Sequence, residues 1–283
     1  SFYYYNAPRP MHSAERAYSD EAVIQELRLV SNTEGLFDWI AGVFYRDQDT
    51  RSQQVNYLRN YYNWAWTAWG CCVLGDDDFR YDRQENFKDS AVFGELTWNI
   101  SDEFRLTGGF RYFDLDYTND TFMGVGLYEA FHVDEQVYLE GSDSDTLFKI
   151  NAAFDVNDET MLYGTISEGF RRGGTNAVPL SGTFAESPAW LSYGPDTTTN
   201  YEVGIKGTWN NSFYNASVFY VDWEDIQLNT ATTNWAFYAA QNGSSATTKG
   251  VELEYDLAFG EGWRLNLGYA YTEGEMDEVM WSA

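Results

Sequence analysis

Basic residues are scarce in this 283-residue chain, where 17 lysines and arginines stand against 44 aspartates and glutamates, a formal charge of −27. This balance argues against a nucleic-acid partner, because binding a duplex requires clustered cations. Proline is also rare, with 5 residues, whereas aromatic residues make up 18% of the chain. Disordered acidic chains are poor in aromatic residues, so the composition indicates a folded protein.

Long apolar runs are missing as well. The most apolar stretch, residues 64–74, is shorter than the ~20 residues that a membrane-spanning helix needs. The mean hydropathy of −0.48 excludes a bundle of such helices. It does not exclude a membrane barrel, because a spanning strand needs only ~9–11 residues, of which every second one is apolar.

Residue types that carry catalysis or bind metals are few. The two histidines, His12 and His132, lie far apart in segments that resemble loops, where an exposed histidine is the simpler interpretation. The segment around Ser167 lacks the glycine pattern of a nucleophile elbow, and residues 171–174 do not match a phosphate-binding loop. We therefore expect no catalytic residue, no resident metal and no cofactor.

Alternation of apolar and polar residues dominates the chain. Residues 251–257 place Val251, Leu253, Tyr255 and Leu257 on one face and three acidic residues on the other. A turn at 260–262 and a second alternating segment at 263–271 follow, which predicts a hairpin with one apolar face.

The same unit recurs, so we predict ten strands in five hairpins, with no helix. The expected strands are 24–31, 36–57, 90–100, 104–119, 146–156, 161–171, 198–209, 213–228, 251–257 and 263–271. The turns inside the hairpins are short, whereas the connections between hairpins (58–82, 120–142, 172–196 and 229–246) are long. Alternating short turns and long loops are typical of an antiparallel transmembrane β-barrel of the outer-membrane type.

The distribution of residue types along the strands favours the same fold class. Aromatic residues cluster near strand ends, as an interfacial girdle would require; they are Trp39, Trp98, Phe104, Tyr163, Trp209, Tyr214 and Trp263. The second face of the strands mixes charges of both signs with small residues, which suits a wide, wet lumen. The alternative is a β-sandwich in which the aromatic residues form the core and the polar face is solvated.

Several of these segments, in this order, resemble the barrel hairpins of TonB-dependent outer-membrane receptors. The resemblance rests on residues 31–45, 162–171, 201–207, 217–227 and 249–254, and it extends over roughly residues 20–275. It implies a barrel of about 22 strands with a plugged lumen. Residues 1–283 would then be a partial barrel domain, with the N-terminal plug domain and the C-terminal strands outside this chain.

The resemblance also implies a location, partners and a function. The location would be the outer membrane of a Gram-negative bacterium, in contact with lipid and lipopolysaccharide. TonB would bind the absent N-terminal part, and a scarce small-molecule nutrient of the siderophore–iron, cobalamin or saccharide type would be imported to the periplasm. Two alternatives stay open: a passive porin-like channel, and a secreted soluble β-sandwich adhesin.

An aromatic loop is the first candidate for ligand binding. Tyr61, Tyr62, Trp64, Trp66 and Trp69 fall within nine residues. Flat, rigid rings of this kind suit stacking on a planar or saccharide-like ligand. The alternative is a loop that packs on itself or on neighbouring loops to cap the barrel.

Charge limits the nature of the ligand. The four long loops hold eleven acidic residues against Arg59, Arg80 and Arg172, so the entrance would repel a polyanion. A strongly anionic ferric chelate is disfavoured unless Arg171 and Arg172 form a local anion clamp. The run of aspartates at 76–78 could collect a divalent cation, but a solvated acidic loop tip is the simpler interpretation.

Cys71 and Cys72 are adjacent in the same loop. Their Cα atoms are about 3.8 Å apart, which is below the usual disulfide range. A strained vicinal disulfide, two thiols, and bridges to cysteines elsewhere all remain open. Because the periplasm is oxidising, we expect some disulfide rather than two free thiols.

Overall fold

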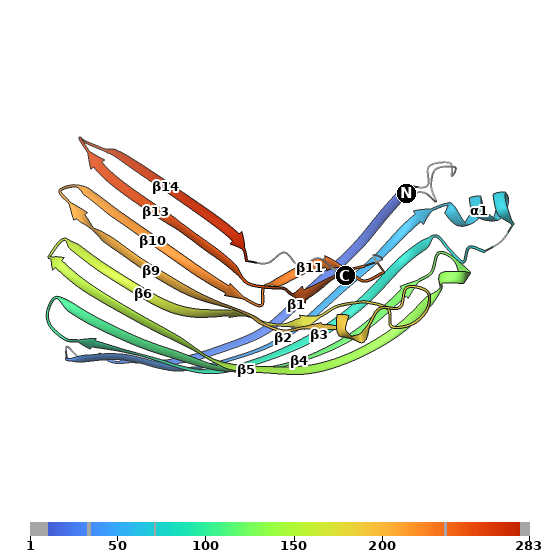
Figure 1. Ribbon diagram of the computed structural model, residues 1–283, viewed down its shortest axis with the longest axis horizontal. Helices are drawn as coiled ribbons and strands as arrows, with labels where there is room; N and C mark the ends of the chain where they lie inside the picture. Colours follow the sequence, from blue (N-terminus) through green and yellow to red (C-terminus); the bar gives the residue numbers. More distant parts are fainter. Residues whose placement is uncertain (1–10, 33–34, 71, 235–236, 278–283) are drawn as a thin grey trace.

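The computed structural model describes residues 11–32, 35–70, 72–234 and 237–277. Its main feature is a single antiparallel sheet of ten strands that follow one another in chain order (Figure 1). The strands are β1 (Met11–Val30), β2 (Phe37–Arg59), β3 (Asp77–Asn99), β4 (Phe104–Val125), β5 (Val133–Asn157), β6 (Thr160–Arg171), β9 (Asp196–Trp209), β10 (Ser212–Glu224), β13 (Ala246–Phe259) and β14 (Trp263–Met276). The predicted ten strands in five hairpins are confirmed.

Short turns and long connections lie at opposite ends of this sheet (Figure 1). The hairpin turns fall at 100–103, 158–159, 210–211 and 260–262, and the turn after β1 includes residues 33–34, which are outside the described part. Asn210, Gly260 and Gly262 adopt positive φ angles, which asparagine and glycine tolerate in tight turns. The long connections contain the remaining elements: α1 (Tyr61–Trp69), η2 (Glu129–Phe131), β7 (Gly174–Thr175), η3 (Pro188–Trp190), β8 (Ser192–Tyr193), β11 (Gln227–Ala231) and β12 (Tyr238–Asn242).

Strand lengths and the presence of a helix differ from the sequence prediction. β1, β3 and β5 begin 13 residues earlier than predicted, at Met11, Asp77 and Val133. The added segments carry polar residues on both faces, so they show no apolar alternation even though each of them pairs with a preceding or following strand. The expectation of no helix is wrong, because α1 forms in the aromatic loop. Within the described chain, no helix has the length and apolar character needed to cross a membrane.

One face of the sheet carries a continuous row of exposed apolar side chains. Leu253 on β13 pairs with Ala216 on β10 and with Tyr269 on β14. Leu253 and Tyr269 remain 43% and 59% exposed, so no second layer of the described chain packs on them. The row continues across the sheet through Trp39, Val43, Val92, Leu96, Phe110, Ile150, Ile166, Val203, Val218 and Leu267. This outward belt is the surface that lipid contact requires, and it argues against the sandwich alternative.

Aromatic residues border the outward belt on both sides. Near the short turns, Phe37 and Trp98 lie with ring centroids 6.2 Å apart, and Phe259 stacks on Trp263 at 6.4 Å. At the other border are the exposed residues Tyr45, Tyr112, Tyr201, Tyr220 and Tyr271. Tyr163 does not belong to this girdle, because its register partner is Gly204 and its hydroxyl donates a hydrogen bond to Glu202 on the opposite face.

The opposite, inner face is polar and charged, as predicted for a wet lumen. The Lys149 ammonium lies 3.0 Å from Glu95, and Arg46 lies 3.5 Å from Asp89. Thr97 and Thr107 share a hydrogen bond of 2.9 Å across β3 and β4. Much of the charge on the inner face is therefore matched within the sheet itself. The same face also carries a small buried apolar cluster of Phe87, Ala91, Phe113 and Leu115.

The pairing between β5 and β6 ends partway along the strands. The last paired residues are Lys149 and Ser167, whereas β5 continues to Val133 and β6 to Arg171. At this seam the Phe148 backbone N–H donates to the Glu168 carboxylate at 2.9 Å, and Phe170 stacks on Phe113 with centroids 3.9 Å apart. Beyond the belt, the wall is therefore divided into two parts that contact each other through side chains. One part is β1–β5, and the other is β6, β9, β10, β13 and β14.

Candidate ligand vestibule

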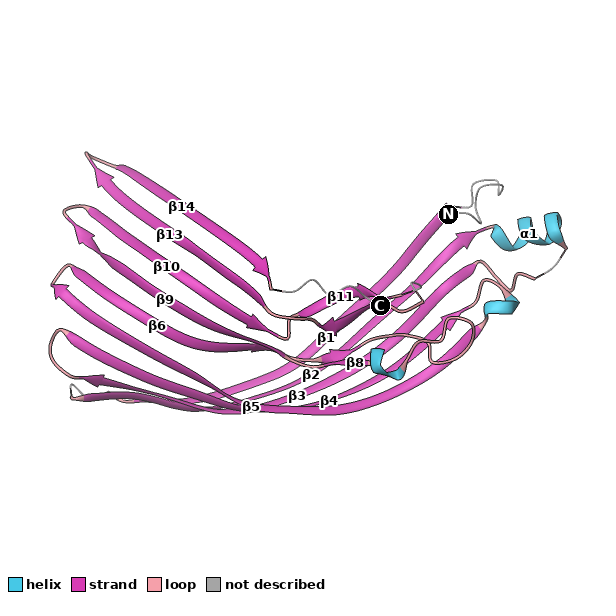
Figure 2. Cartoon of the chain, in the orientation of Figure 1, coloured by secondary structure: helices cyan, strands magenta, loops and turns pink. Residues whose placement is uncertain are grey.

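Two of the long connections fold inward instead of standing free. Residues 172–195, after β6, and the described residues 225–234 and 237–245, after β10, lie on the concave side of the sheet (Figure 2). Trp190, Leu191 and Ala239 from these connections are buried in one cluster, against Val137 and Leu139 of the β5 inner face. We call the pair the inward loops. Burial of their apolar side chains fixes them against the wall.

Asparagine side chains hold the inward loops to each other. Asn176 donates to the carbonyls of Trp190 and Ala240 at 2.9 and 2.8 Å, and its own side-chain oxygen accepts from the Ala240 N–H at 2.9 Å. Asn242 accepts from the Gly194 N–H at 2.6 Å and donates to the Asp225 carbonyl at 2.8 Å. Strand pairing occurs within each inward loop, as β7–β8 and β11–β12, and these amides supply partners for backbone groups between the loops.

The base of the inward loops is fixed by a buried carboxylate. Asp196, at the start of β9, is 1% exposed. It accepts hydrogen bonds from Arg171 Nη2 at 2.5 Å and from the Gln227 backbone N–H at 3.0 Å. The Arg171 guanidinium also lies 5.4 Å from the centroid of the Trp223 ring. Three segments therefore meet at Asp196, and the charge of Arg171 is already matched by a carboxylate.

A cavity of about 750 Å³ opens between the inward loops and the wall. The wall side comes from β1–β3 and the end of β4, and the loop side from Asn176, Ala177, Phe184, Phe237 and Tyr238. The wall residues are Arg16, Gln54, Asn56, Asp78, Phe79, Tyr81, Arg83 and Val125. We call this cavity the vestibule. Its size falls within the range of small-molecule sites, and its lining combines aromatic rings with a few polar groups.

Aromatic rings from both sides approach each other in the vestibule. Phe79 of β3 lies 6.0 Å from Phe237 of the inward loops, and 5.9 Å from Tyr81, measured between ring centroids. The Arg83 guanidinium lies 6.0 Å from the Tyr81 ring centroid. This arrangement offers flat faces for a planar ligand together with a positive charge beside them.

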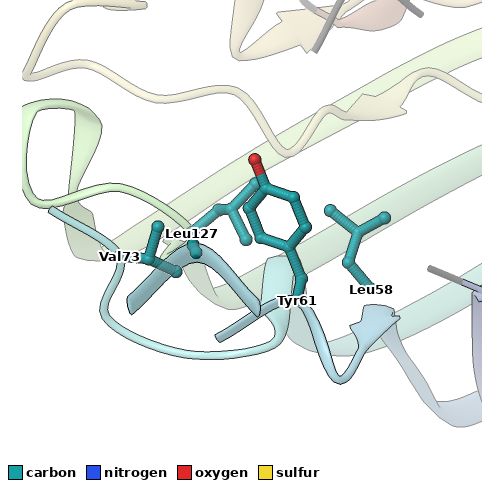
Figure 3. Close-up of a cluster of buried hydrophobic side chains, with 5 residues drawn as sticks. Leu58, Tyr61, Val73 and Leu127 are labelled. Atoms are coloured by element: carbon teal, nitrogen blue, oxygen red, sulfur yellow. The ribbon is translucent and has the colours of Figure 1, made fainter. Parts of the chain in front are cut away.

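The predicted aromatic loop is located elsewhere. Its residues form α1, in which Tyr61 is fully buried with Leu58, Val73 and Leu127 (Figure 3). The Tyr61 hydroxyl shares a hydrogen bond of 2.7 Å with Tyr128. The two residues spaced four apart, Tyr61 and Ala65, point into this small core, as helical periodicity requires.

The other aromatic residues of α1 divide between the core and solvent. Trp64 packs against the core cluster, whereas Tyr62, Trp66 and Trp69 are 40%, 45% and 50% exposed. The Trp66 indole N–H donates to the Val73 carbonyl at 3.0 Å. None of the five predicted aromatic residues lines the vestibule, so their role as ligand contacts stays a prediction.

Asp76 and Cys72, which flank the end of the loop that holds α1, have structural partners. Asp76 accepts hydrogen bonds from the backbone N–H groups of Asn60 and Tyr62, at 2.9 and 2.8 Å, and so caps the start of the helix. Cys72 has a φ of 81° and is disulfide-bonded, whereas Cys71 lies outside the described residues. In the part of the chain that is described, no group of three or more His, Cys, Asp or Glu residues is placed to hold a metal ion.

Arg171 and Arg172, the candidate anion clamp, contact different partners. While Arg171 binds Asp196, the Arg172 guanidinium lies 3.6 Å from the centroid of the Phe87 ring and donates to Gln48 at 3.4 Å. Burial is the main reason that the pKa of Arg172 is lowered from its ordinary value. Burial, and then the Glu85 carboxylate, raise the pKa of Tyr193 in the same region, so its phenol stays protonated at neutral pH.

Together, the outward belt, the polar inner face and the loop-lined vestibule define an outer-membrane β-barrel. The model of the family described as TonB dependent receptor-like, beta-barrel matches residues 1–280. The chain therefore belongs to the TonB-dependent receptors, as part of their barrel. This family consists of transport receptors in the outer membrane of Gram-negative bacteria, which is where the chain is located.

Relatives with known roles agree with this membership. The chain is 27% identical over 173 residues to the pesticin receptor of Yersinia pestis, which covers 61% of the chain and 24% of that receptor. It is 30% identical over 129 residues to the ferripyoverdine receptor of Pseudomonas aeruginosa, covering 43% and 15%. The chain thus spans about a quarter, or less, of the length of the curated relatives it matches.

Solved structures agree with the fold. The chain resembles the ferric yersiniabactin uptake receptor of Yersinia pestis, with a TM-score of 0.76 and 18% identity, over 94% of the chain and 37% of that structure. The ten strands described here therefore correspond to part of a larger receptor barrel in that protein.

Proposed function

We propose that the complete protein is a TonB-dependent receptor that captures a scarce nutrient at the cell surface and imports it to the periplasm. The nutrient is of the siderophore–iron type, as the names of the pesticin-receptor, ferripyoverdine-receptor and yersiniabactin-receptor relatives suggest. Cobalamin or a saccharide would be the alternative. The observation that carries this proposal is the vestibule, a ligand-sized cavity between the inner wall and the inward loops, above a lipid-facing belt.

In this proposal, residues 1–283 supply part of the barrel wall and several outer loops. An N-terminal plug domain would occupy the lumen, and a segment before it would bind TonB. The charged inner face, with pairs such as Lys149–Glu95, would lie against that plug. No bond of the nutrient is made or broken, so the protein acts as a transporter and not as an enzyme.

The outer surface would contact lipid and lipopolysaccharide. Exposed Val203 and Val218 face outward from adjacent strands, at the depth where acyl chains lie. Tyr201 and Tyr220, with ring centroids 6.3 Å apart, would sit at the headgroup level on the long-loop side.

A strain that lacks the complete gene tests the proposal. In iron-limited medium, the complemented strain should accumulate radioactive iron from a supplied ferric chelate, and the deletion strain should not. Removing TonB should abolish accumulation in the complemented strain. Accumulation that persists without TonB would support the passive channel instead. Recovery of the protein in a soluble fraction without detergent would support the secreted adhesin.

A further inference from the structure

Eleven of the sixteen lysines and arginines in the described residues form ion pairs with carboxylates. In the described residues, ion pairs within 4.0 Å engage Arg28, Arg46, Arg51, Arg59, Arg80, Arg105, Arg111, Arg171, Arg264, Lys149 and Lys249. A chain with 44 acidic residues easily supplies such partners. Cations without an ion pair that gather in one cavity therefore make that cavity more positive than the rest of this acidic protein.

Two of the unmatched cations line the vestibule. Neither Arg16 nor Arg83 forms an ion pair with a carboxylate of the described chain, although both line the same cavity. The Nε atom of Arg83 is buried and has no hydrogen-bond partner. A buried guanidinium N–H without an acceptor in the protein costs free energy, and a ligand oxygen would remove that cost.

Strand register brings the two guanidiniums to the same place. Arg16 on β1 pairs with Gln54 on β2, which pairs with Tyr81 on β3, and Arg83 follows two residues along on the same face. Neighbouring strands are about 4.8 Å apart, so β1 and β3 are separated by roughly 10 Å. Two long arginine side chains can reach one ligand across that distance.

The acidic residues nearby do not cancel this charge. Within the described residues, Asp78 is the single acid that lines the vestibule. Glu85, two residues from Arg83, accepts hydrogen bonds from Asn119 at 3.0 Å and from Thr175 at 3.4 Å. The vestibule lining therefore carries two positive charges against one negative charge, inside a protein whose total charge is strongly negative.

We propose that the vestibule selects a ferric chelate with a small net negative charge and a planar aromatic donor group, bound by Arg16 and Arg83. Anionic phenolate or carboxylate oxygens would accept from the two guanidiniums, and Phe79, Tyr81 and Phe237 would stack on the aromatic part. The acidic outer loops set an upper limit on the charge, because they would repel a polyanion. This inference rests on the proposed function and names the ligand class of the same site.

The test uses two simple chelates of different charge. Ferric bis(salicylate) carries one negative charge with aromatic phenolate and carboxylate donors, whereas ferric tris(acetohydroxamate) is uncharged and has no ring. Binding of each to the full-length receptor in detergent is followed by quenching of tryptophan fluorescence, in low salt and with 0.5 M NaCl. We expect tighter binding of the salicylate complex, weakened by the salt.

Matched variants assign the effect to the two arginines. R83Q and R16Q should each raise the Kd for ferric bis(salicylate) by roughly 10–100-fold, the loss expected for a hydrogen bond to a charged group. R83K, which keeps the charge, should lose less than R83Q. K88Q is the control, because it removes one positive charge from β3 on the outward face and should change Kd by less than about 2-fold. Normal heat-modifiable migration on gels would show that each variant is folded.

The outcomes separate this inference from the proposed function. Equal or tighter binding of the uncharged chelate, no detectable binding of ferric bis(salicylate) up to ~1 mM, or an unchanged Kd in both R16Q and R83Q overturns the anion selectivity. The proposed function would still stand if TonB-dependent iron accumulation persisted in the complemented strain. Loss of that accumulation, with anion-selective binding intact, would instead overturn the transport function.

Discussion

The carboxylate of Asp196 and the guanidinium of Arg171 lie 2.5 Å apart, with the aspartate 1% exposed and the arginine side chain 51% exposed. The aspartate also accepts from the Gln227 backbone, so one buried group connects the end of β6, the start of β9 and the start of β11. This contact ties the bases of both inward loops to the barrel at one residue.

We predict that D196A loosens both inward loops together. It removes the acceptor of Arg171 and of the Gln227 N–H, and the loss should be about 1–3 kcal/mol of local stability. Hydrogen exchange should rise in residues 172–195 and 225–245 alike. D82A, which breaks an exposed pair with Arg51, is the control and should cost at most about 1 kcal/mol. Faster exchange in only one of the two loops would contradict the joint attachment.

A second prediction concerns the outward belt. L253R places a charge on the lipid-facing side of β13 and should lower the free energy of unfolding by ~2–4 kcal/mol if the residue lies near the bilayer midplane. E252R, one position along the same strand, faces the lumen and should have a much smaller effect. Urea unfolding in lipid vesicles measures both. Equal tolerance of the two variants would show that Leu253 does not contact lipid.

The third prediction concerns α1. Y61A removes a fully buried ring and its hydroxyl contact with Tyr128, so we expect a loss of about 3–5 kcal/mol within this small core and local unfolding of the helix. Y62A removes an exposed ring and should stay within about 0.5 kcal/mol. Limited proteolysis between β2 and β3 reports the difference. The opposite pattern would identify the exposed rings as ligand contacts: Y62A would reduce ligand uptake while its helix stayed intact, and Y61A would not reduce uptake.

The fourth prediction is a pH dependence on the outer face. A hydrogen bond from Arg51 is the main reason that the pKa of Asp82 is lowered from its ordinary value. Because the folded-state pKa is depressed, the pair contributes stability at neutral pH and loses it as the pH falls through that pKa. NMR titration of labelled aspartate in R51Q should show the pKa of Asp82 moving up towards the ordinary value of an aspartate side chain. R59Q, whose partner is Glu15, should leave it unchanged.

The strands that cross the membrane could be predicted from sequence, because lipid selects every second side chain. The alternation at 251–257 and the register of Leu253 agree for this reason. Beyond the belt, water contacts both faces, and residues 79–89 of β3 show no apolar period even though each one pairs with β2 or β4. The position of Tyr163 near a turn predicts a girdle residue. The strand register, however, decides which face of the sheet its side chain occupies, and that is the inner face.

The vestibule could not be predicted from sequence. Arg16 and Arg83 are far apart in the chain, and only the pairing of three strands brings them to one cavity. The sequence shows the high density of aromatic residues at 61–69. Such rings can either stack on a ligand or form a small hydrophobic core, and the sequence does not distinguish the two. The spacing of Tyr61 and Ala65 was the available signal for a helix with one buried face.

The hydrogen bonds that Asn176 and Asn242 form from one inward loop to the other have a consequence for how such receptors can diversify. Each asparagine is carried by one inward loop and completes backbone groups of the other. A chimera that receives a single foreign loop would leave carbonyls and amides facing the wrong neighbour. We therefore expect new ligand ranges to be acquired, in nature or by grafting, through exchange of the two loops as a matched set.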